Sequence, residues 1–103
     1  MRLPILTLRL YRHEKDGVCE EIHGHGYLPK VLDPSGWVEQ ECAGTYPTQY
    51  FRFTGPAGWV RGWYMTRPDG SLFYHEAFDP FEVKTDGDVL NIQCAYDVRA
   101  LSA

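Results

Sequence analysis

A long β-hairpin is predicted by the stretch WVRGWYMTRPDGSLFYHE, residues 59–76. Two runs rich in aromatic and β-compatible residues flank a turn in which Pro68 presets φ, Asp69 can hydrogen-bond locally and Gly70 accepts a positive φ. We therefore expect a central hairpin at about residues 59–78. Gly62 lies in the middle of its first arm, where a missing side chain marks a bulge or a neighbour pressed against the backbone.

Strand alternation gives this hairpin two distinct faces. It places Trp59, Arg61 and Trp63 on one face and Val60 and Tyr64 on the other. One face must be core, and the other is where we expect a partner. The tryptophan face has three open readings: packing between sheets, a protein interface rich in the Trp, Tyr and Arg typical of interface centres, or a platform for sugar rings. The candidate interface residues are Trp59, Arg61, Trp63, Tyr64 and Tyr74.

The remaining strands are predicted by the same period of two. In the first, residues 4–12, Leu6, Leu8 and Leu10 share one face. Shorter strands are expected within 37–42 and 48–54. A last strand runs from 89 to about 98, and its inward residues are expected to be Leu90, Ile92, Cys94, Tyr96 and Val98.

Turn signals recur about every ten residues, which favours an all-β fold. We expect a single antiparallel β-sandwich, Ig-like or jelly-roll-like, or a small barrel. The 103 residues suit a single domain, residues 1–103. The polar segment at about residues 13–26 is expected to be a loop.

The composition argues against nucleic-acid and membrane partners. Ten Lys and Arg residues oppose fourteen Asp and Glu residues, for a net charge of −4, and the basic residues are scattered. We therefore expect no nucleic-acid binding, since that affinity comes mainly from clustered basic side chains. No apolar run approaches the roughly 20 residues of a membrane span, so we expect a soluble chain made in the cytosol and no membrane partner. The three cysteines are expected to be reduced thiols.

The candidate metal ligands are His23 and His25, with Cys19 close by in sequence. Two histidines at i and i+2 on an extended segment can reach one metal ion. The alternative is a solvated polar loop, which is our expectation, together with no cofactor and no catalytic residue. A small metal-dependent enzyme built on these three residues is kept as a rival hypothesis.

The order and spacing of several motifs resembles a group of small tailed-bacteriophage proteins encoded among virion structural genes. The matching elements, in order, are Leu8-Arg9-Leu10-Tyr11, Gly26-Tyr27, Leu32, Trp37, Tyr46-Pro47, Phe51-Arg52-Phe53, Val60-Arg61-Gly62-Trp63-Tyr64, Asp69-Gly70-Ser71-Leu72, Glu76-Ala77-Phe78-Asp79-Pro80-Phe81-Glu82-Val83 and Gly87-Asp88-Val89-Leu90-Asn91-Ile92. The chain departs from the group in its charged, histidine-bearing region at residues 13–25.

The resemblance implies a virion structural role without catalysis. The first expectation is a capsid decoration or cement protein that contacts the major capsid protein and forms a homo-oligomer, located in the virion. One alternative is a tail- or fibre-associated structural protein that contacts tail subunits. Another, of a different class, is a carbohydrate-binding module that uses Trp59 and Trp63.

Overall fold

The computed structural model describes residues 3–97 and shows an all-β fold in which every strand pairing is antiparallel. A five-stranded sheet has the order β2-β1-β7-β8, with β3 also paired to β1; a second sheet is β10-β5-β4 and a third is β6-β9. The strands are β1 (Leu6–Lys15), β2 (Val18–Glu21), β3 (Lys30–Leu32), β4 (Val38–Gln40), β5 (Ala43–Thr45), β6 (Gln49–Arg52), β7 (Gly58–Thr66), β8 (Leu72–Val83), β9 (Val89–Ile92) and β10 (Ala95–Asp97), and a 3-10 turn covers Pro34–Gly36. The described residues contain no helix long and apolar enough to cross a membrane.

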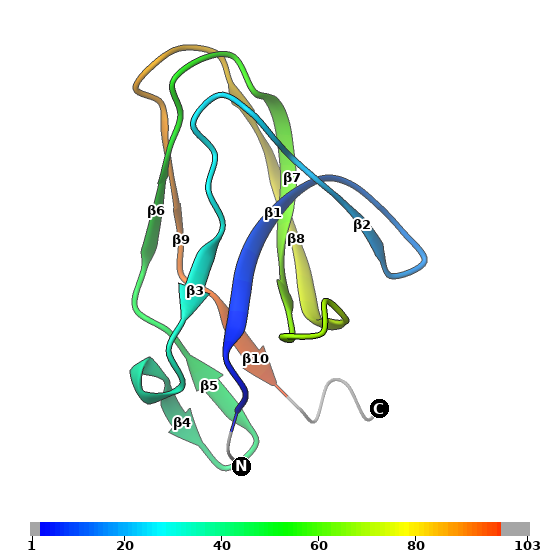
Figure 1. Ribbon diagram of the computed structural model, residues 1–103, viewed down its shortest axis with the longest axis vertical. Coiled ribbons are helices and arrows are strands. Elements are labelled where there is room, and N and C mark those ends of the chain that lie inside the picture. The colour runs from blue at the N-terminus through cyan, green and yellow to red at the C-terminus, as the bar shows by residue number, and fades with distance from the viewer. Residues whose placement is uncertain (1–2, 98–103) are drawn as a thin grey trace.

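Figure 1 shows the β6-β9 pair standing on one side of the molecule and the five-stranded sheet on the other, with β4, β5 and β10 together at one end. One hydrophobic cluster draws on all three sheets. Leu6, Leu8 and Leu10 are fully buried in it, as their alternation predicts, and so are Phe51 and Phe53 from the segment around β6. The core therefore lies between the five-stranded sheet and the two smaller sheets.

The central hairpin is confirmed as β7 and β8, but β8 continues to Val83, beyond the expected end at about residue 78. Its turn is closed by a backbone hydrogen bond of 2.9 Å from the Arg67 N–H to the Ser71 carbonyl. Asp69 accepts a 2.9 Å hydrogen bond from the Ser71 N–H, and Gly70 has a φ of 88°. The turn residues thus act as their chemistry predicts.

The predicted division of the hairpin into two faces is wrong. Val60 and Trp63 are both core residues, and Trp63 is only 4% exposed, whereas Trp59 points to solvent. The pairing register between β7 and β8 shifts between Val60 and Gly62, which interrupts the alternation of sides. Trp59 and Trp63 therefore lie on opposite faces of β7.

The polar segment at residues 13–26 is also different from the expected loop. β1 continues to Lys15 and β2 begins at Val18, so that Asp16 and Gly17 form a two-residue hairpin turn with φ values of 52° and 80°. Asp-Gly favours such turns because both positions accept a positive φ. This hairpin projects from the body of the molecule (Figure 1). The parts of β1 and β2 next to its turn therefore carry few of the apolar residues that alternation detects.

The last predicted strand is divided between two sheets. β9 ends at Ile92 and pairs with β6, whereas β10 begins at Ala95 and pairs with β5. Its inward residues Ile92, Cys94 and Tyr96 are buried as predicted, and Leu90 packs against the core. Because buried and exposed residues keep alternating from Ile92 to Tyr96, alternation alone does not reveal the break between β9 and β10. Val98, the last predicted inward residue, lies outside the described residues.

Candidate interaction surface

The face of the five-stranded sheet that points away from the core carries three cross-strand rows of side chains. We call this surface the outer sheet face. Its residues alternate along β1 with the core leucines, and their pairing partners share their side of the sheet. Across the strands, the rows are Val31–Thr7–Thr66–Leu72, Arg9–Tyr64–His75 and Glu21–Tyr11–Gly62–Ala77.

Gly62 lets an aromatic ring lie directly on the sheet. A Cβ atom at this position would overlap the hydroxyl and ring of Tyr11 and the carbonyl oxygen of Glu76. Tyr11 also contacts Tyr64, with ring centroids 6.3 Å apart. The close backbone approach expected at Gly62 is therefore confirmed, and it explains why Tyr11 is buried although it faces away from the core.

A continuous hydrogen-bond network links side chains of the outer sheet face to the backbone N–H of Leu10 in β1. Arg9 donates from Nη1 to both carboxylate oxygens of Glu21, at 3.2 and 3.1 Å, and from Nε to the hydroxyl of Thr66 at 3.1 Å. The Tyr27 hydroxyl donates to Glu21 at 2.6 Å and accepts the backbone N–H of Leu10 at 3.1 Å. Burial and the hydrogen bond to Glu21 raise the pKa of Tyr27, so this hydroxyl keeps its proton.

We expect Tyr27→Phe to lower the free energy of unfolding by about 2 kcal/mol, because it leaves the buried Leu10 N–H without its acceptor. Urea denaturation measures the loss. Tyr50→Phe, at a tyrosine that is 59% exposed, is the matched control and should change stability by less than about 0.5 kcal/mol. Equal effects of the two substitutions would show that the network contributes nothing measurable.

Burial is the largest cause that raises the pKa of Tyr64, to about 12; the negative charge of Glu21 adds to the shift and Arg9 opposes it. An unfolded tyrosine ionises near pH 10, so between about pH 10 and 12 the unfolded state binds fewer protons than the folded state. We therefore expect the contribution of Tyr64 to stability to be constant below pH 10 and to fall as the pH rises toward 12. In urea titrations at increasing pH, Tyr64→Phe should show a shallower fall, whereas Tyr50→Phe should match the unaltered chain; identical slopes for both variants would contradict the assignment.

The predicted interface residues divide into an exposed group and a core group. Trp59 is 47% exposed, and the Arg61 guanidinium carbon lies 6.0 Å from its ring centroid. Trp63 instead packs against Tyr74, with centroids 5.9 Å apart, and Tyr74 packs on the core. Tyr64 lies in the middle row of the outer sheet face. A sugar platform made of both tryptophans is therefore not formed.

The candidate metal ligands are not gathered into a site. Cys19 is part of β2, and His25 lies in the following loop with a φ of 53° and with its Nδ1 close to Gly55. Among the described residues, no group of three or more His, Cys, Asp or Glu side chains is arranged to hold a metal ion.

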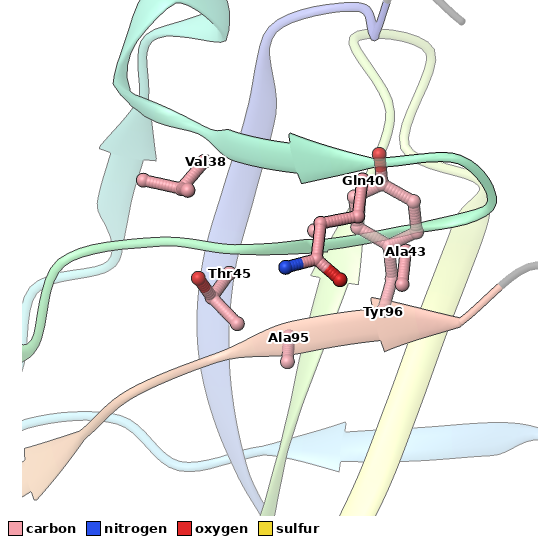
Figure 2. Close-up of a pocket in the computed structure, with 7 residues that line it drawn as sticks. Val38, Gln40, Ala43, Thr45, Ala95 and Tyr96 are labelled. Atoms are coloured by element: carbon pink, nitrogen blue, oxygen red, sulfur yellow. The ribbon is translucent and has the colours of Figure 1, made fainter.

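A shallow depression lies on the β10-β5-β4 sheet and has a volume of about 170 Å³. Figure 2 shows side chains from all three strands around it, while the Tyr96 ring extends from β10 toward β4. The Tyr96 hydroxyl donates to Glu39 at 3.4 Å, and its ring is part of the hydrophobic core. The lining residues are Val38, Gln40, Ala43, Gly44, Thr45, Ala95 and Tyr96, and they include no nucleophile–base pair or metal-ligand set.

Sequence reasoning missed most of the outer sheet face. The alternation of β1 identifies Thr7, Arg9 and Tyr11 as residues of one face. Their cross-strand neighbours come from β3 and β7, far away in the chain, and no local signal specifies that pairing.

No family model matches this chain, no curated protein matches it, and no solved structure matches it.

Proposed function

We propose that this protein is a structural component of a tailed-bacteriophage virion, a capsid decoration or cement protein that acts through protein contacts. The resemblance in sequence to small virion proteins motivates the proposal, and the antiparallel all-β fold agrees with it. Its partner is the major capsid protein, with a tail or fibre subunit as the alternative.

The observation that best supports a contact role is the exposed pair of Trp59 and Arg61. An aromatic ring of this size left 47% exposed beside a guanidinium group combines two of the three residue types enriched in binding hot spots. Glu82 is paired with Trp59 across β7 and β8, so the two side chains share one side of the sheet. This end of the outer sheet face is where we place the contact with the virion subunit.

Mass spectrometry of purified particles tests the proposal. The protein should be present in stoichiometric amounts, and separating tails from filled heads should identify its partner. Its absence from both fractions would overturn the virion role.

Trp59→Ala tests the contact itself. We expect the variant to bind particles lacking the native protein roughly thirtyfold more weakly, because loss of a hot-spot residue costs about 2 kcal/mol. Tyr50→Ala is the matched control, since Tyr50 is an exposed aromatic residue on β6, in a different sheet, and it should bind normally. Normal binding by Trp59→Ala would move the contact to another surface.

A further inference from the structure

We propose that the free edge of β8 binds an extended segment of another protein as an added β-strand. This segment carries an apolar, a basic and an apolar side chain at three alternate positions. β8 is the last strand of the five-stranded sheet and pairs only with β7, so its other edge presents unpaired backbone groups. The inference concerns this edge alone and does not rest on the proposed contact at Trp59 of β7.

The free backbone groups of β8 can be assigned from its contact with β7. The carbonyl oxygen of Glu76 lies so close to Gly62 of β7 that a Cβ atom there would overlap it. Successive residues of a paired strand direct their N–H and C=O groups to opposite edges, so those of His75 and Ala77 point away from β7. No hydrogen bond from another element in residues 3–97 reaches them. They are therefore available to an added strand.

The side chains on the core side of this stretch define the sequence that fits. Tyr74 pairs with Met65 and Glu76 pairs with Trp63, and both partners on β7 are core residues. Tyr74 and Phe78 are half-buried and pack on the core, whereas Glu76 between them is exposed. An added strand sets its side chains beside those of the residues it pairs with. Its two apolar side chains therefore cover the rings, and its basic side chain reaches the carboxylate.

Glu76 makes the basic position selective. It forms no salt bridge within the described part of the chain, where the acidic members of the ion pairs are Glu20, Glu21 and Glu82. Opposite charges across paired strands are favourable and like charges are unfavourable. Pairing of β8 with β8 of a second copy, centred on Glu76, sets two carboxylates opposite each other. The charge therefore favours a basic partner over a second copy of this chain.

Two irregularities limit the binding stretch to a few residues. The register between β7 and β8 shifts before Tyr74 and again after Ala77, and Pro80 has no N–H to donate. Bulges, prolines and inward-pointing charges are the devices that keep an edge strand from pairing indiscriminately. Only the regular stretch at residues 74–77 stays open between them, so the added strand must be short and must match its side chains.

Two synthetic peptides test the proposal. In one capped heptapeptide threonine alternates with valine, lysine and valine; in the other, glutamate replaces the lysine. We expect the lysine peptide to shift the amide NMR signals of His75 and Ala77 most, and to bind about fivefold more tightly than the glutamate peptide. No shift at the β8 amides with either peptide, or equal affinities of the two, would overturn the proposal, and Glu76 would then only protect the edge.

Charge substitutions on the protein separate Glu76 from the overall charge of the chain. Glu76→Gln should abolish the preference between the two peptides, and Glu76→Lys should reverse it. Glu41→Lys is the matched control because Glu41 is an exposed glutamate in the turn between β4 and β5, in a different sheet; it should keep the preference. The amide spectrum of each variant also reports whether it is folded. A preference that survives Glu76→Gln, or that Glu41→Lys removes equally, would contradict the assignment.

Discussion

Gly62→Ala is expected to lower the free energy of unfolding by about 3 kcal/mol, a large fraction of the stability of a domain of this size. The new methyl group would overlap the Tyr11 ring on one side and the carbonyl oxygen of Glu76 on the other. The ring can rotate away, but the carbonyl belongs to the paired strand β8, so the sheet itself must deform. Urea denaturation measures the loss.

Two further variants separate this overlap from the general effect of replacing a glycine. Gly70→Ala introduces a methyl group with no atom within 4 Å at a φ of 88°, so it should cost only the strain of a left-handed residue, about 1 kcal/mol. Adding Tyr11→Ala to Gly62→Ala should recover little, because the clash with the Glu76 carbonyl remains. If Gly62→Ala were as stable as the unaltered chain, the Glu76 carbonyl of β8 would not lie as close to Gly62 as described.

Much of the fold follows from local patterns in the sequence. Alternation identifies the buried Leu6, Leu8 and Leu10, and the chemistry of Pro68 and Asp69 identifies the central turn. These predictions succeed because side-chain direction in a strand and φ in a turn are set by neighbouring residues.

The errors arise where distant contacts override the local pattern. Asp16–Gly17 is a dipeptide that favours a hairpin turn. The exposed strands on either side of it lack apolar alternation, so the local pattern predicts a loop. Between Val60 and Trp63 the side chains of β7 stop alternating regularly between the two faces of the sheet. This change depends on the register between β7 and β8, which no residue of β7 alone specifies.

Only part of the outer sheet face could be predicted from the sequence, for the same reason. Gly62 signalled a close neighbour, but its identity, Tyr11, depends on the pairing of β1 with β7. The Tyr27 hydroxyl accepts the hydrogen bond of the buried Leu10 N–H. It does so at the part of β1 that lies between its pairing with β2 and its pairing with β3. Such a gap exists only once three separate segments have been placed beside one another.

The two tryptophans of β7 should respond in opposite ways to truncation. Trp63→Ala is expected to cost about 4 kcal/mol, because it removes a buried ring that packs on Tyr74 and leaves a cavity in the core. Trp59→Ala should cost less than about 1 kcal/mol, since it loses only an exposed contact with Arg61. Urea denaturation of both variants, which differ only in the position of one identical substitution on one strand, makes the comparison.

Fluorescence quenching by acrylamide provides a second readout that does not depend on stability. Trp59 is exposed, whereas Trp63 and Trp37 are buried, so removing Trp59 should abolish most of the readily quenched emission. Removing Trp63 should leave that emission in place for as long as the variant remains folded. Large stability losses and unchanged quenching for both variants would restore the regular alternation of β7, place Trp59 in the core beside Trp63, and remove the exposed ring on which the proposed contact with a virion subunit depends.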